Sequence, residues 1–213
     1  MKQRVSPSSK RKLLDLHAWK EPPYTLFVLG GFTGFVGLYI PFFFTTSFAA
    51  GKAGASEQLA SYFIPILNAA SIFGRIIPNL VADKIGPLNV LIPCTFAVGI
   101  LAFSWIAVHD VGGLTAFAVV YGFFSGTFVS LPPSTIATLS PNLNTVGTRM
   151  GMAFSAVGLG ILIGNPIAGA LLDLRTMKFI NAQIFCGATV VAAGIFFLLA
   201  RIAKTGASWK VVA

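Results

Sequence analysis

The sequence predicts an all-α membrane protein with six transmembrane helices, and three observations support that prediction. Of its 213 residues, 55% are hydrophobic and only 10% are charged, whereas roughly a quarter of the residues in an average soluble domain are charged. The mean hydropathy is +0.82, and 20 phenylalanines against 4 tyrosines favour surroundings of hydrocarbon. The apolar residues are also gathered into six long runs rather than spread along the chain.

The six runs have the length of membrane-spanning helices. They cover residues 24–50, 58–82, 88–108, 114–139, 149–172 and 179–200. A helix needs about 20 residues to cross the ~30 Å hydrocarbon layer, and the lack of period-2 alternation excludes a lipid-embedded barrel. Short breaks predict antiparallel neighbours, and Ser56 can cap the second helix. We therefore divide the chain into a basic segment (1–23), a six-helix bundle (24–202) and a short tail (203–213).

The basic residues predict the orientation. The formal net charge is +9, but the charges lie between and outside the runs, so no nucleic-acid partner is expected. With six spans both termini share one side, and Lys and Arg favour cytosolic loops. That side carries Lys2, Arg4, Lys10, Arg11, Lys12, Lys20, Lys84, Arg149, Arg201, Lys204 and Lys210, and the other carries Lys52, Arg175 and Lys178. We expect cytosolic termini, no signal peptide, and a multi-pass protein of the plasma or vacuolar membrane.

Glycines and prolines predict how the helices pack. The glycine pairs at positions 30 and 34, 122 and 126, and 160 and 164 are each four residues apart, so each pair lies on one helix face and permits close backbone approach. Prolines interrupt several spans and free carbonyl groups, which a neighbour or water must satisfy. These prolines are Pro41, Pro65, Pro78, Pro93, Pro132, Pro133 and Pro166. The third and sixth runs contain few glycines, and we expect them at the lipid-facing periphery.

Arg75 is the one ionisable residue well inside a run. Insertion scales assign a cost of about 3 kcal/mol to an arginine at the centre of a membrane helix, so a compensating partner is expected. None of the six runs contains an Asp or Glu. Contact with an anionic substrate, structural pairing with backbone or lipid, and snorkelling towards the interface all remain open.

Other polar residues of the runs are weaker candidates for contact with a solute. Asn68 and Ser71 share a helix face with Arg75, and Tyr121 and Asn165 lie in the fourth and fifth runs. Alternatively, each of these side chains forms a hydrogen bond between helices. No nucleophile with its base, metal cluster or phosphate loop is visible, so we expect neither an enzyme nor a cofactor. Cys94 and Cys186 lie inside apolar runs and are interpreted as buried hydrophobic residues.

Residues 74–86, GRIIPNLVADKIG, resemble the helix-loop-helix signature of the major facilitator superfamily, G-x-x-x-D-[RK]-x-G-[RK]. Asp83, Lys84 and Gly86 match this conformational motif, whereas Asn79 and Pro87 depart from it. The match is therefore partial.

Longer segments resemble the C-terminal six helices of the fungal monocarboxylate-permease-like family, within the monocarboxylate transporter family. The segments are SIFGR (71–75), YGFFSG (121–126), FVSLPP (128–133) and GNPIAGAL (164–171), and the resemblance extends from about residue 16 to 204. It implies half of a 12-helix bundle that moves small organic solutes, often monocarboxylates. In animal relatives an acid precedes the arginine by one turn. Ser71 stands there in this chain, so proton coupling through such a pair is not expected.

The resemblance covers only one of the two halves between which such carriers bind their solute near the bilayer midplane. We therefore expect a transporter or half-transporter for small organic anions that works by alternating access, with Arg75, Ser71, Asn68, Tyr121 and Asn165 near the substrate. A homodimer or a separate N-terminal half would complete it. The alternative is a truncated, non-transporting membrane protein that only binds another membrane subunit.

Overall fold

A computed structural model describes residues 14–172 and 177–206, and within them it confirms the six predicted spans. Six helical segments are long and apolar enough to cross a membrane, and their ends lie within a few residues of the predicted runs. The α-helices are α1 (Pro22–Leu38), α2 (Ile40–Gly51), α3 (Glu57–Ser61), α4 (Phe63–Ile85), α5 (Pro87–Ser104), α6 (Val111–Ser130), α7 (Pro132–Leu139), α8 (Leu143–Leu171) and α9 (Ile180–Thr205). Short 3-10 helices, η1 (Leu16–Lys20) and η2 (Trp105–Ala107), precede α1 and follow α5.

Two of the predicted proline breaks divide a span. Pro41 lies at the start of α2, directly after the break that ends α1, and Pro132 begins α7 after α6. By contrast, Pro78, Pro93 and Pro166 lie inside the continuous helices α4, α5 and α8. The expected cap of the second span is also present, because the Ser56 hydroxyl accepts a hydrogen bond from the Leu59 amide at 3.3 Å.

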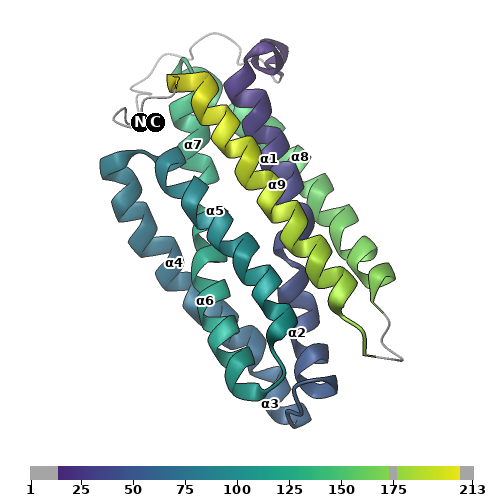
Figure 1. Ribbon diagram of the computed structural model, residues 1–213. Coiled ribbons are helices and arrows are strands. Elements are labelled where there is room, and N and C mark those ends of the chain that lie inside the picture. The colour runs from purple at the N-terminus through teal and green to yellow at the C-terminus, as the bar shows by residue number, and fades with distance from the viewer. Residues whose placement is uncertain (1–13, 173–176, 207–213) are drawn as a thin grey trace, which may run out of the picture.

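The helices form one bundle in which α1 and α9 pack along each other at the centre, α4 packs on α6, and α8 packs on α1 (Figure 1). η1 and the last turns of α9 lie at the upper end in Figure 1, which we call the terminal end. The placement of the third and sixth spans at the lipid-facing periphery stays a prediction, whereas within this chain the second and fifth spans are the least buried. Of the residues in the most apolar stretch of each span, 22% are buried in the second and in the fifth span, 50% in the third and 44% in the sixth.

Glycines bring backbones into direct contact at the interfaces of these two least buried spans. A Cβ added at Gly74 of α4 would lie 1.7 Å from the Phe123 carbonyl oxygen of α6, and one at Gly164 of α8 would lie 2.0 Å from the Val36 carbonyl oxygen of α1. The predicted pairs at 122 and 126 and at 160 and 164 make the same kind of backbone contact. Small residues thus hold α4 and α8 to the bundle by close van der Waals packing.

Side chains of neighbouring helices satisfy carbonyl groups that the prolines free. Pro78 leaves the Gly74 carbonyl of α4 without its helical donor, and the Thr127 hydroxyl of α6 donates to that oxygen at 2.8 Å. Pro41 has the same effect on the Gly37 carbonyl, which accepts the Cys186 thiol of α9 at 3.3 Å. Both native cysteines are free and buried, as predicted.

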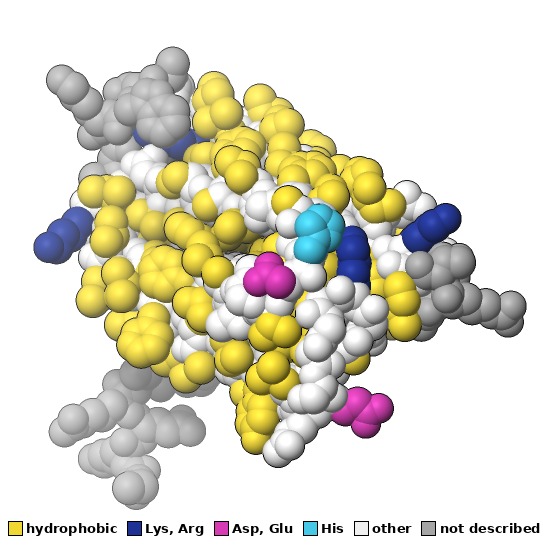
Figure 2. Space-filling view, turned by 60° about the horizontal axis from the view of Figure 1, so that its bottom comes forward, with side chains coloured by type: hydrophobic (Ala, Val, Ile, Leu, Met, Phe, Trp, Pro, Cys, Tyr) yellow, Lys and Arg dark blue, Asp and Glu magenta, His cyan; other side chains and the backbone are white. Residues whose placement is uncertain are grey.

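The surface of the bundle matches a protein that lies in lipid. Figure 2, with the lower end of Figure 1 turned forward, shows apolar side chains over most of that face and only isolated charged ones. Many large apolar side chains are exposed, including Ile72, Phe73, Ile76 and Leu80 of α4 and Leu162 of α8. Such a surface is normal in hydrocarbon and unfavourable in water.

Candidate functional site

The helix α4 has a packed face and an open face. Its buried positions, Leu67, Ser71, Gly74, Pro78 and Ala82, recur every three or four residues, so they form one stripe. The other face projects large apolar side chains away from the bundle. This division places any polar residue of the open face against lipid or against a further protein surface.

Arg75 lies at the edge of that open face and its side chain is exposed. It is ten residues before Ile85, the last residue of α4, which places it about 15 Å from that end of the helix. Among the described residues no hydrogen-bond or ion-pair partner of its guanidinium is found. The side chain therefore presents a permanent positive charge at mid-depth of an apolar surface.

The two residues predicted to accompany Arg75 on α4 have different surroundings. Asn68 is exposed like Arg75, and its amide donates to the Ile64 carbonyl oxygen at 3.0 Å. Ser71 is buried against Gly126 of α6, and its hydroxyl donates to the Asn68 carbonyl oxygen at 2.7 Å. Asn68 and Arg75 thus share the open face two turns apart, whereas Ser71 contributes to the packed face.

Tyr121 and Asn165 lie away from Arg75. Tyr121 is fully buried, and its hydroxyl donates to the Leu38 carbonyl oxygen at the α1–α2 break at 2.9 Å. Asn165 lies on α8, and its amide oxygen is buried with no hydrogen-bond partner among the described residues. Figure 1 shows α4, which carries Arg75, and α8, which carries Asn165, on opposite sides of the bundle. These two helices belong to the two spans with the lowest buried share.

The conformational motif lies at the terminal end between α4 and α5. Gly86 alone joins the two helices, with φ of 96°, a conformation that other residues rarely adopt. Asp83 and Lys84 are exposed beside it. A cavity of about 230 Å³ opens here, lined among others by Asn79, Asp83, Ser134 and Thr138. Asn79 also donates to the Ser130 hydroxyl at 2.9 Å, an interhelical bond that ties α4 to α6.

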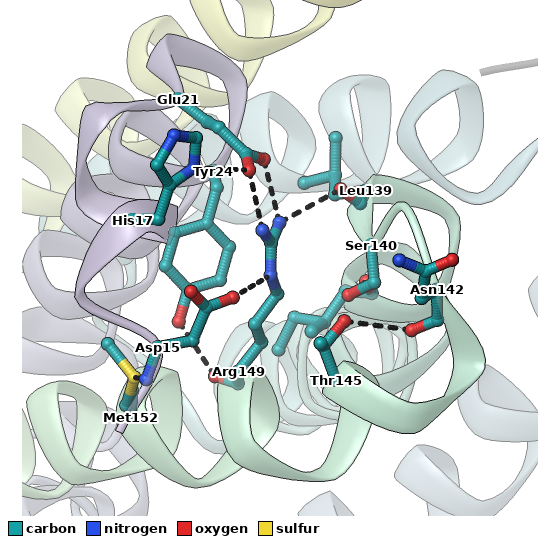
Figure 3. Close-up of polar contacts among 11 residues, drawn as sticks. Asp15, His17, Glu21, Tyr24, Leu139, Ser140, Asn142, Thr145, Arg149 and Met152 are labelled. Atoms are coloured by element: carbon teal, nitrogen blue, oxygen red, sulfur yellow. Dashed lines mark hydrogen bonds and ion pairs between the residues drawn. The ribbon is translucent and has the colours of Figure 1, made fainter. Parts of the chain in front are cut away.

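An ionic cluster that was not predicted from the sequence surrounds Arg149, which is 2% exposed near the start of α8. Figure 3 shows its guanidinium between two acids and the end of α7. Two nitrogens donate to the two Glu21 oxygens at 2.6 and 2.7 Å, and Nε donates to Asp15 at 3.0 Å. The Leu139 carbonyl oxygen accepts at 3.4 Å, and the Arg149 carbonyl oxygen accepts from the Tyr24 hydroxyl at 2.7 Å. We call these residues the Arg149 cluster.

The Arg149 cluster links the segment before the first span to the fourth and fifth spans. The hydrogen bonds from Arg149 hold the pKa of the Glu21 carboxyl below its usual value, because they favour the ionised form. A bidentate pair of this kind is among the stronger side-chain contacts. One signal was available in the sequence, since two of the chain's 6 acids lie in the basic segment before the first run. Their partner, however, is more than 120 residues away.

These features define the class of protein: a multi-pass helical membrane protein with the six-helix architecture of half a major-facilitator-type bundle. Known transporters are similar to it over nearly its whole length. The chain is 41% identical over 201 residues to the MFS-type transporter dbaD of Emericella nidulans. The aligned region covers 94% of this chain and 45% of dbaD. No protein-family model matches the chain.

Two further relatives are efflux proteins. The chain is 35% identical to the aspyridones efflux protein apdF of Emericella nidulans over 92% of this chain and 40% of apdF. It is 34% identical to the agnestins efflux protein AgnL12 of Paecilomyces divaricatus over 90% of this chain and 44% of AgnL12. The chain thus spans about half the length of the curated relatives it matches.

Proposed function

We propose that this chain is one six-helix half, the C-terminal one, of a major-facilitator transporter that moves a small organic anion by alternating access. The observation that carries the proposal is Arg75, exposed and without a described partner at mid-depth of α4, in a chain similar to transporters. A planar guanidinium recognises a carboxylate through paired hydrogen bonds. The names of two relatives, which are efflux proteins, favour export as the direction of transport.

The completing partner is a second six-helix half that covers the open faces of α4 and α8. These two helices have the lowest buried share of the six spans, and the matched relatives are about twice as long as the chain. Asn68, Ser71, Tyr121 and Asn165 are proposed to support the solute site. Asn165 has a buried oxygen without a partner in the part of the chain that the structure describes, whereas Tyr121 and Ser71 would act through the packing of the helices that carry the site. Both termini are proposed to be cytosolic.

The test is uptake into reconstituted vesicles. The chain is co-expressed with the half of dbaD that it does not match, purified as a pair, and supplied with radiolabelled pyruvate and acetate. We expect Arg75→Ala and Arg75→Lys to abolish uptake while the protein still inserts, because lysine cannot form the planar fork. Ile77→Ala, also on the exposed surface of α4, is the matched control and should leave uptake unchanged. Full uptake by Arg75→Ala would remove this residue from the mechanism.

A second candidate function is a non-transporting membrane subunit, which the large uncovered surfaces of α4 and α8 also favour. Mass measurement in native detergent separates the two. A stable dimer or hetero-pair that moves solute supports the half-transporter. A chain that binds another membrane protein and moves no probe, in any pairing, supports the subunit.

A further inference from the structure

Residues 14–20 lie outside the membrane-spanning helices and expose large apolar side chains at the terminal end. Leu14 is 61% exposed, Leu16 69% and Trp19 40%, whereas Ala18 is fully buried. The segment therefore has one side against the bundle and one apolar side turned outward. These exposed apolar side chains do not belong to a membrane-spanning helix, because the first span begins at Pro22.

Specific contacts fix the orientation of this segment. Asp15 is paired with Arg149, and its amide donates to the Met152 sulfur at 3.4 Å. At the other end, the Thr25 hydroxyl donates to the Trp19 carbonyl oxygen at 2.8 Å, and the Trp19 and Tyr24 rings meet edge to face at 6.0 Å. These contacts hold the segment against the bundle with Leu14 and Leu16 turned outward and Trp19 partly exposed.

The charge of the N-terminal region points to an anionic partner. Its basic residues are Lys2, Arg4, Lys10, Arg11, Lys12 and Lys20. Its two acids, Asp15 and Glu21, are both ion-paired with Arg149. Arg149 offsets one of these two negative charges, and the six basic residues outnumber the one that remains, so the N-terminal region carries a net positive charge that attracts an anionic surface.

We propose that residues 14–20 are an interfacial anchor that binds the anionic phospholipid headgroups of the bilayer surface at the terminal end. Trp19 and the two leucines enter the interface, where indole rings and apolar side chains are favoured, and the exposed Lys20 binds the headgroup charge. The Arg149 cluster holds this anchor against α8. The anchor acts independently of any solute that the bundle moves.

The test measures the depth of a spin label in nanodiscs. Both native cysteines are buried, so a single cysteine introduced as Leu16→Cys is labelled selectively in the folded full chain. Ser56→Cys, in an exposed position before α3 at the other end, is the matched control. Each protein is reconstituted in phosphatidylcholine alone and in phosphatidylcholine with phosphatidylserine, and quenching by oxygen and by a water-soluble nickel chelate is compared.

We expect the label at position 16 to be several-fold more accessible to oxygen, relative to nickel, than the label at position 56. Phosphatidylserine should increase this difference, and Lys20→Gln or high salt should reduce it. The proposal is overturned if the two labels have the same accessibility in both lipids. It is equally overturned if position 16 is shielded only when a second six-helix half is added, since a protein surface would then be its partner.

Discussion

Arg75 and Arg149 both lie in membrane-spanning helices, yet their surroundings are opposite. Arg75 is surrounded by apolar residues in the sequence and exposed on the structure, with no described partner. Arg149 stands at the edge of an apolar run, yet it is 2% exposed and paired with two acids. Apolar neighbours in the sequence therefore indicate how deep in a span an arginine lies. Whether that arginine has an ion-pair partner depends on residues distant in the chain.

The largest expected effect is the loss of stability on removing the paired arginine. Arg149→Ala should lower the free energy of unfolding by about 3 kcal/mol, because two partly buried carboxylates lose their counter-ion. Arg75→Ala, the matched control, should change it by less than about 0.5 kcal/mol, as for an exposed side chain without partners. Unfolding by dodecyl sulfate in mixed micelles, followed by circular dichroism, measures both. Equal losses in the two variants would contradict the contrast.

A smaller effect is expected from the packed face beside Arg75. Gly74→Ala should cost about 2 kcal/mol, since the added methyl group would meet the Phe123 carbonyl oxygen and force the helices apart. Gly158→Ala on α8 is the matched control, because nothing lies within 4 Å of its added Cβ. That variant should be neutral or more stable. A neutral result for Gly74→Ala would mean that α4 is not held as closely to α6 as the structure has it.

Thr127→Val sharpens the comparison by removing a single hydrogen bond from the same interface. We expect a loss of about 1 kcal/mol, since the Gly74 carbonyl freed by Pro78 loses its donor in a buried setting. Thr33→Val is the control, because that hydroxyl bonds only to carbonyls of its own helix. The same micelle titration compares them, and a larger loss at Thr33 would refute the role assigned to Thr127.

The smallest effect is expected from pH near neutrality. Arg149 lowers the pKa of Glu21 below its ordinary 4.5, so the stability from this pair is fully present above the ordinary pKa and is lost as the pH falls through the lowered value. Stability should therefore be flat between pH 6 and 8 and fall in more acidic solution. Glu21→Gln should reduce the acid-side slope. A stability change centred near pH 7 that Glu21→Gln abolishes would contradict this assignment.

Local composition was enough to predict the spans, but not the partners of their polar residues. Run length and proline position gave the six helices and the breaks at Pro41 and Pro132, because each depends on a few consecutive residues. The pairing of Arg149 with Glu21 joins residues 128 positions apart, which no local pattern contains. The packing of the glycine-poor third and sixth spans on each other is likewise a contact between distant segments, which their composition does not reveal.

The single residue that connects α4 and α5 has a mechanical consequence. Gly86 is the whole linker, and its backbone has a conformation that glycine favours. A linker of one residue is too short for the second span to slide along the third. Any tilt of α4 must be transmitted to α5 at that corner. The end of α4 and the start of α5 must therefore stay adjacent whenever either helix moves, and a linker lengthened by a few flexible residues would let them separate.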